Sequence, residues 1–269
     1  MTPILQRRLP VAPWMADHML RLPGTVPVPL ADWLQRDEVF AEQMAARDYL
    51  IAERPAAVHA LAGSARPAAE ELLALVLSYL DGVPGYVREG ATMRRPDGVL
   101  VSLGGEPLIA AGRLVQEDEV LLERPAGADE HVLTGAILCF PSNWTLAEKF
   151  GKGLVRIHLP IERYDEGVAK RVQRLFDAIR PEAPIMRANL LLYSDPALFN
   201  PRTEFARHAP DHGAAQYVRV ERQTLLRLPE TRAVVFSIHT YMIRPGDLTE
   251  EQRAKLAEVR PGAFAANPA

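Results

Sequence analysis

The sequence contains a single cysteine, Cys139, among its 269 residues. One thiol excludes an internal disulfide and any metal site built from a cysteine cluster. Cys139 lies inside the apolar run 137–140, a setting typical of a small buried side chain rather than of a nucleophile. The chemistry of the chain is therefore expected to come from other residue types.

Long apolar runs and an excess of either charge are also missing. No apolar stretch approaches the ~20 residues that a membrane-spanning helix needs, and residues 1–10 have their charges too late for a signal peptide. The 31 basic and 34 acidic residues leave a formal net charge of only -3, so no overall field attracts nucleic acid or anionic lipid. We expect a cytoplasmic protein that binds neither nucleic acid nor membranes.

The glycine-rich signatures of common nucleotide-binding and hydrolase folds do not occur. No Gly-x-Gly-x-x-Gly turn follows an expected strand, and the chain has neither a Gly-x-x-x-x-Gly-Lys-Ser/Thr loop nor a Gly-x-Ser-x-Gly elbow. Ordinary dinucleotide binding, P-loop chemistry and serine hydrolysis are therefore not supported. The 48% of hydrophobic residues is nevertheless enough for a sizeable core.

Proline is frequent near the N-terminus, at positions 3, 10, 13, 23, 27 and 29. Proline interrupts helices and favours extended backbone. With Trp14 and Leu22 as apolar anchors, residues 1–35 are predicted to form an arm packed on the body. Residues 36–269 are predicted to form one domain.

Apolar residues at helical spacing predict several amphipathic helices further along the chain. One of them begins at Thr249, where Gln252 completes a capping box. In the segment 141–151, Ser142 or Asn143 is predicted to cap a short helix. The longer predicted helices run from an Asp37 cap to about 53, from Pro67 to 80, from Pro107 through Leu122, and from an Asp165 cap to Pro181.

Runs rich in β-branched and aromatic residues predict five strands. They are Val99–Leu103, Val132–Phe140, Ile185–Tyr193, Tyr217–Leu226 and Ala233–Met242. The link 228–231 between the last two is too short for a crossover helix, so these two strands are expected to pair antiparallel. The predicted fold class is α+β, an antiparallel five-stranded sheet with flanking helices and an N-terminal arm.

Three of these strands carry polar residues at alternating positions. Because side chains alternate between the two faces of a strand, these residues are predicted to share one concave sheet surface. A surface of this kind, with a few converging polar groups, is the usual form of a binding site. The alternative is a half-exposed sheet whose charges face water. The predicted set is Arg187, Asn189, Arg219, Glu221, Gln223, Ser237 and His239.

Among the histidines, His158 stands in a short apolar segment that a proline ends. A lone histidine in such a place is more often a core residue than a ligand, and both interpretations stay open on this observation. His239 lies on the last predicted strand, where it is a candidate to line the pocket.

Ten short segments, taken in order, resemble the haem-dependent oxidative N-demethylase alpha-subunit family. The resemblance spans nearly the whole chain. Its most informative segments are Cys139-Phe-Pro-Ser-Asn-Trp144, Glu148-Lys-Phe-Gly151, Ile157-His-Leu-Pro160, Arg187-Ala-Asn189 and Arg219-Val-Glu-Arg-Gln-Thr224.

The resemblance implies a PAS-like antiparallel sheet that holds a b-type haem. It implies removal of a methyl group from dimethylamine or a similar small amine with O2, releasing formaldehyde. A separate NADPH-dependent flavin and iron–sulfur reductase would supply electrons, and tetrahydrofolate would be a possible acceptor of the formaldehyde.

The same resemblance assigns roles to single residues. His158 would be the axial iron ligand, a role that suits a neutral imidazole. Arg219 and Arg222 would pair with the haem propionates, as guanidinium groups do well. Glu221 would hold an ammonium substrate or take up a proton, with Arg219 beside it in the catalytic pair.

The remaining assignments concern the wall of the pocket. Arg187 and Gln223 would help to bind the cofactor, and Asn189 and His239 would contact the substrate. Two positions depart from the family pattern: Leu190 stands where the family often has tryptophan, and His239 stands where it more often has arginine. These departures leave the identity of the amine open and make His239 a second candidate iron ligand. A non-catalytic haem sensor and a haem-free interaction protein are the alternative functions.

Overall fold

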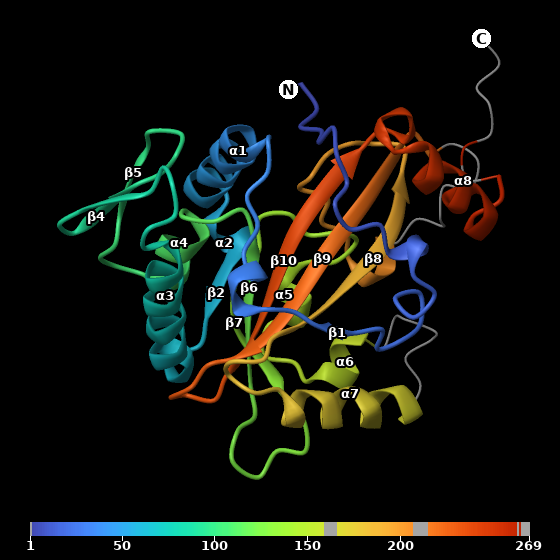
Figure 1. Ribbon diagram of the computed structural model, residues 1–269. Helices are drawn as coiled ribbons and strands as arrows, with labels where there is room; N and C mark the ends of the chain where they lie inside the picture. Colours follow the sequence, from blue (N-terminus) through green and yellow to red (C-terminus); the bar gives the residue numbers. More distant parts are fainter. Residues whose placement is uncertain (1, 159–165, 207–214, 263, 265–269) are drawn as a thin grey trace.

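A seven-stranded antiparallel sheet forms the centre of the protein (Figure 1). The computed structural model describes residues 2–158, 166–206, 215–262 and 264. In spatial order the strands are β1 (Val26–Pro27), β8 (Ile185–Tyr193), β9 (Tyr217–Arg227), β10 (Val234–Ile243), β6 (Asp118–Glu123), β7 (Val132–Ile137) and β2 (His59–Leu61). A separate three-stranded sheet consists of β3 (Val87–Glu89), β4 (Thr92–Arg94) and β5 (Leu100–Ser102).

Helices surround this sheet, and no helix among the described residues is long and apolar enough to cross a membrane. The α-helices are α1 (Phe40–Glu53), α2 (Pro55–Val58), α3 (Arg66–Leu80), α4 (Pro107–Gly112), α5 (Leu146–Lys149), α6 (Leu154–His158), α7 (Glu166–Ala178) and α8 (Glu250–Val259). Short 3-10 turns lie at Pro13–Met15, Leu30–Asp32, Gly63–Ala65, Glu204–Ala206 and Pro245–Asp247.

The α+β class is confirmed, but the five-stranded PAS-like sheet is wrong. The predicted strands 185–193, 217–226 and 233–242 are adjacent in the observed sheet, and the last two pair antiparallel as expected. The strand predicted at 99–103 belongs to the small second sheet instead. The two edge strands, β1 and β2, span two and three residues, too few to show a period in the sequence.

The helix predicted from Pro107 through Leu122 is also wrong beyond its first turns. α4 does begin at Pro107, but the chain then enters strand β6. In the structure Glu117, Asp118 and Glu119 are each at most 1% exposed, and each has a partner from a distant segment: His239, Arg47 and Ser237 respectively.

The clearest helix predictions are confirmed. α1 and α3 occupy the segments that the apolar stripes indicate, and the capping box of α8 forms, with Thr249 Oγ1 accepting from Gln252 N at 3.1 Å. α7 lies where the fourth stripe places it, while its predicted cap, Asp165, is outside the described residues.

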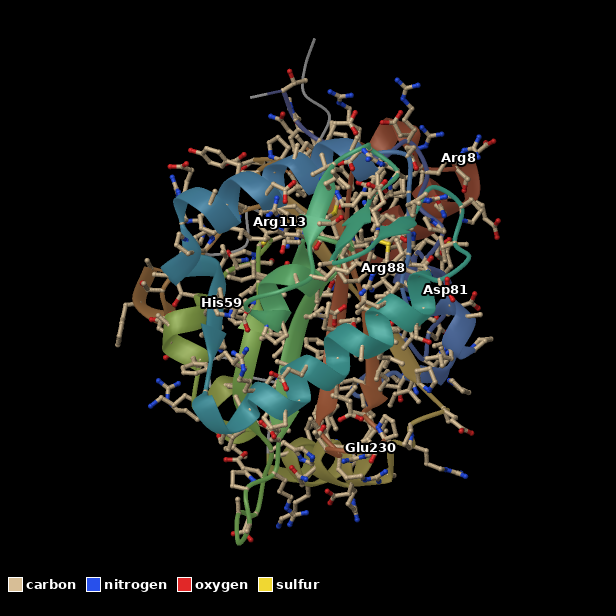
Figure 2. The ribbon with its side chains drawn as sticks, turned by 90° about the vertical axis from the view of Figure 1, so that its left-hand side faces the viewer. Arg8, His59, Asp81, Arg88, Arg113 and Glu230 are labelled. Carbon is tan, nitrogen blue, oxygen red and sulfur yellow. The ribbon has the colours of Figure 1, made fainter. Side chains whose placement is uncertain are left out.

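Strand pairing gives the large sheet two distinct faces. We call them the arm face, which carries the β9 residues Val218, Val220, Arg222, Thr224 and Leu226, and the α7 face, which carries the β9 residues Arg219, Glu221, Gln223 and Leu225. The arm face packs against α1, α3 and α4 at one end and against the N-terminal arm and α8 at the other (Figures 1 and 2). The α7 face packs against α5, α6 and α7. The core therefore lies in two layers, one on each side of the sheet.

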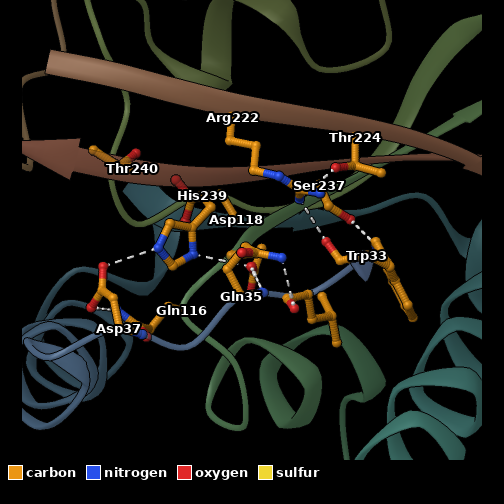
Figure 3. A network of polar contacts seen from close by, with 12 residues as sticks. Trp33, Gln35, Asp37, Gln116, Asp118, Arg222, Thr224, Ser237, His239 and Thr240 are labelled. Atoms are coloured by element: carbon orange, nitrogen blue, oxygen red, sulfur yellow. Dashed lines mark hydrogen bonds and ion pairs between the residues drawn. The ribbon is translucent and has the colours of Figure 1, made fainter. Parts of the chain in front are cut away.

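A buried polar network fastens the arm to the arm face (Figure 3). Trp33 Nε1 donates to Ser237 Oγ at 2.8 Å, and Arg222 donates to the carbonyl oxygens of Trp33 at 2.9 Å and Asp32 at 2.5 Å. Strand β1 adds the arm to the sheet edge by pairing Val26 with Met186. The arm is thus held by buried polar groups of the sheet, of which Arg222 donates and Ser237 accepts.

His239 lies at the centre of this network and is fully buried. Its Nδ1 is 3.0 Å from Glu117 Oε1, and its Nε2 is 3.2 Å from Asp37 Oδ2. Burial alone disfavours the imidazolium, but the two carboxylates outweigh burial and raise the pKa of His239 to about 9. The imidazolium on strand β10 therefore forms ion pairs with the segment before α1 and with the segment before β6.

Stability is expected to decrease at alkaline pH because of His239. Its pKa in the folded protein is about 9, above the ordinary value of 6.5, so its contribution is complete below pH 6.5 and is lost as the pH rises through 9. The loss should be on the order of 3 kcal/mol in the free energy of unfolding. Urea unfolding at a series of pH values measures it.

The variant His239→Gln should remove this part of the pH dependence, and His18→Gln, at an exposed position, should keep it. A wild-type protein whose unfolding free energy is constant from pH 6.5 to 9.5, or a His239→Gln variant with the wild-type slope, would contradict this account of the network.

Candidate functional site

Polar side chains form a connected row on the α7 face, across strands β8 and β9. The register places Arg187 directly opposite Gln223 and Asn189 directly opposite Glu221. Arg187 NH1 donates to Gln223 Oε1 at 2.6 Å, and Gln223 Nε2 donates to Glu221 Oε2 at 3.2 Å. The sequence analysis predicted that these residues share a surface, and the structure brings them together.

The carboxylate of Glu221 is the centre of this row. Its Oε2 also accepts a hydrogen bond from Asn189 Nδ2 at 2.8 Å, and its Oε1 accepts from Arg219 Nε at 3.2 Å. Asn189 Oδ1 in turn accepts from the backbone N–H of Glu221 at 2.9 Å. Glu221 is 7% exposed, so these donors replace much of the water that a carboxylate would otherwise bind.

Arg219 connects this carboxylate to two loops. It is fully buried and donates to Phe140 O at 2.5 Å and to Leu198 O at 3.0 Å, besides its ion pair with Glu221. A guanidinium with three acceptors in fixed directions is held firmly. Arg219 therefore positions Glu221 and offers little of its own surface to a ligand.

Access to the row is along β8. The α7-face residues of β8 are all half-buried, whereas Arg219, Glu221 and Gln223 opposite them on β9 are buried. Arg187 Nε also donates to Pro23 O of the arm at 3.1 Å. The arm thus contributes a backbone group to the site, which the sequence did not indicate.

Tyr193, at the end of β8, is a further site residue that the sequence analysis did not single out. Its hydroxyl oxygen accepts from Asn143 Nδ2 at 2.7 Å and is 2.6 Å from Ser142 Oγ. Burial raises its pKa. The alternation of β8 in the sequence places Tyr193 on the same face as Arg187 and Asn189, and this pattern could have identified it as a site residue.

Those contacts correct the prediction for Ser142 and Asn143. Neither residue caps a helix: α5 begins one residue after Thr145, which is its N-cap. The segment 142–143 instead closes one end of the polar row, because its two side chains bind the tyrosine hydroxyl. In the sequence, a short polar segment that caps a helix looks the same as one that binds a distant side chain. Only the contact with Tyr193 in the folded protein distinguishes the two.

His158 is the last residue of α6, which packs on the α7 face through Leu154. Its Nδ1 lies 2.8 Å from Leu154 O, so Nδ1 carries the proton and Nε2 carries the lone pair in the neutral ring. Burial lowers the pKa of His158, and the charges of Lys149 and Arg187 lower it further. The ring is therefore a neutral base close to the polar row.

The structure separates Arg222, Ser237 and His239 from this site. The register pairs His239 with Arg222 and Thr240 with Glu221, so His239 and Arg222 both lie on the arm face (Figure 3). The prediction that the polar residues of β10 and β9 share one surface is wrong, because an antiparallel hairpin decides which positions of its strands share a face. Arg222 is held by backbone carbonyls of the arm and by Thr224. Both nitrogens of His239 face carboxylates.

No cluster of three or more histidine, cysteine or acidic side chains in the described part of the chain is arranged to hold a metal ion. The polar row on the α7 face offers the carboxylate of Glu221 with its fixed donors, and the neutral imidazole of His158 lies on a helix packed on the same face. Such a set suits an organic cation or a cofactor that needs one protein ligand.

A family model described as haem-dependent oxidative N-demethylase, alpha subunit-like, matches residues 24–262 of this chain. The match includes the whole polar row, His158 and the two loops that Arg219 contacts.

Removal of Asn189 tests whether it holds the carboxylate of Glu221. Asn189→Ala should lower the free energy of unfolding by about 1–3 kcal/mol, because the backbone N–H of Glu221 loses its acceptor and Glu221 Oε2 loses one of its donors. Asn189→Asp keeps the shape but places two carboxylates together, so its deficit should shrink as the pH falls and the pair takes up a proton. Chemical denaturation across pH measures both. Equal stability of all three proteins would show that Asn189 does not hold Glu221.

Proposed function

The chain belongs to the haem-dependent oxidative N-demethylase, alpha subunit-like family, and we propose that it removes a methyl group from a small methylated amine with O2 and a bound haem b. The observation that carries this proposal is the position of Glu221. A fixed carboxylate on the half-open α7 face, on which the helix carrying a neutral imidazole also packs, suits an ammonium substrate next to a haem.

The residues of the α7 face fit a haem. His158 provides an imidazole whose Nδ1 is held by a backbone carbonyl, the arrangement that orients histidine ligands in metalloproteins. Lys149 and Arg187 are cations near that ring and suit propionate groups. Trp144, Phe150 and Ile157 supply partly buried apolar surface close by. We assign His158 as the axial ligand and Arg187 as a partner for a propionate.

The overall reaction is balanced by two electrons and two protons from outside the substrate. A dimethylammonium ion, O2, two electrons and two protons would give methylammonium, formaldehyde and water. A bound haem supplies the redox chemistry that activates O2. The residues of this chain bind the amine, orient it and provide a place for the proton that leaves it.

Glu221 performs the binding step in this proposal. Its carboxylate is fixed by Asn189, Gln223 and Arg219, so an alkylammonium that pairs with it is oriented without further ordering of the side chain. The ammonium must lose a proton before its nitrogen can be oxidised, and Glu221 is the nearest base in the row. The half-buried β8 side chains Leu191 and Tyr193 limit the size of the amine.

The electrons must come from another protein. One cysteine cannot hold an iron–sulfur cluster, and the chain has no glycine-rich turn for a flavin or NADPH. The description of the family as alpha subunit-like supports a partner subunit. A flavin and iron–sulfur reductase, and tetrahydrofolate as formaldehyde acceptor, remain predictions of the family resemblance.

Haem binding is tested by the absorption spectrum of the purified protein after addition of haem. We expect a Soret band near ~400 nm that His158→Ala shifts or weakens, because the imidazole supplies an axial bond. His18→Ala, at an exposed position, is the matched control and should leave the spectrum unchanged. A wild-type protein without a Soret band would exclude haem, and an unchanged band in His158→Ala would exclude that ligand.

Turnover is tested with short methylated amines, O2 and a chemical or protein reductant. Glu221→Gln should keep the haem spectrum and lower kcat/KM for formaldehyde release by tenfold or more, since it removes the charge that pairs with the ammonium. Glu230→Gln, at an exposed position in the turn after β9, is the control. Haem binding with no formaldehyde from any amine would favour a sensor over an enzyme, and full activity of Glu221→Gln would remove Glu221 from the mechanism.

A further inference from the structure

Helix α6, which ends at His158, is too short to be stable alone. It has five residues, and isolated helices shorter than ~12–15 residues are marginal in water. The direction of the His158 ring therefore depends on contacts that hold both ends of α6 from outside.

The N-terminal end of α6 is held by residues 130–131. Leu154 N donates to His131 O at 3.1 Å, and Val155 N donates to Glu130 Oε2 at 2.7 Å. Glycine at position 153 lets the Glu130 side chain come this close, because a Cβ there would lie 2.0 Å from Glu130 Oε1. The first turn of α6 thus has fixed partners for its free N–H groups.

The C-terminal end of α6 is held by Lys149. Its ammonium donates to Ile157 O, one residue before His158, and its side chain comes from α5. Lys149 is only 6% exposed, and its Nζ lies 5.9 Å from the centroid of the Trp144 ring. Burying an ammonium is costly, so the groups that contact it must offset its desolvation.

We propose that Lys149 is the positioning residue for His158: its ammonium fixes the C-terminal carbonyl of α6 and so directs the imidazole toward the polar row. This inference rests on the proposed function for the role of His158 as iron ligand. The hydrogen bond from Lys149 to Ile157 O forms within the protein and does not depend on haem.

The charge of Lys149 has a second effect once His158 binds iron. A cation near the C-terminal end of a helix is favourable, because the helix dipole is negative there. In α6 this end carries His158. A positive charge close to the axial ligand favours the ferrous over the ferric iron, because the ferric state adds one positive charge. Lys149 therefore raises the reduction potential, which a purely structural side chain would not do.

Three variants of the full-length protein separate these effects. Lys149→Met keeps the length and the apolar stem and removes the ammonium. Lys149→Arg keeps the charge and a donor that can reach the carbonyl. Lys152→Met removes an exposed lysine three positions further on and is the matched control.

The first measurement is hydrogen exchange in the haem-free protein. Lys149→Met should speed exchange of the Ile157 and His158 amides by tenfold or more, while the amides of β8 and β9 keep their wild-type rates. Lys149→Arg should restore slow exchange, and Lys152→Met should not change it. Unchanged exchange at Ile157 in Lys149→Met, or an equal increase throughout the sheet, would overturn the proposal.

The second measurement is the reduction potential and ferric spectrum of the haem-loaded proteins. Lys149→Met should lower the potential and alter the ferric ligand-field bands, and Lys149→Arg should return both towards wild type. A potential that falls equally in the Met and Arg variants would overturn the role of the charge. If the wild-type protein binds no haem, the proposed function fails, whereas the exchange rates still decide whether Lys149 holds α6.

Discussion

Each buried charge on strand β9 must have a partner, and this requirement organises the structure around the strand. β9 buries three arginines, a glutamate and a glutamine, and side chains at successive positions point to opposite faces of the sheet. Because an unpaired buried charge is very costly, the rest of the chain must supply acceptors and donors on both sides. The arm provides carbonyls for Arg222, and the loops at 140 and 198 provide them for Arg219.

The two faces meet this requirement in different ways, and the difference separates structure from function. On the arm face the network is closed: His239 is fully buried between two carboxylates, and Arg222 is covered by the arm. On the α7 face the row stays half-open along β8, where Arg187 and Asn189 hold Glu221 and Gln223 from the accessible side. Among the described residues, the polar row on the α7 face is therefore the more accessible of the two networks.

The orientation of the candidate iron ligand, His158, also depends on partners for buried polar groups, in this case the backbone groups at the ends of α6. α6 has too few residues to define its own direction, so the carboxylate of Glu130 and the ammonium of Lys149 hold its two ends. Both groups lie outside the helix, and both satisfy backbone groups that a helix end leaves unpaired. The imidazole of His158 is thus oriented by the protein before any cofactor binds, which is the condition for a well-defined axial bond.

The sequence by itself determined the elements whose residues repeat with a clear local period. α1, α3, α8 and the bounds of β8, β9 and β10 follow from such patterns, and so do the alternating polar residues and the family resemblance. It did not determine β6, whose acidic residues Asp118 and Glu119 look exposed in the sequence but bind Arg47 and Ser237 from distant segments. Nor did it determine which polar residues share a face. Only the tertiary structure decided that Ser237 and His239 lie on the face opposite Glu221, because the register of an antiparallel pair is set by contacts across the strands and not by either strand alone.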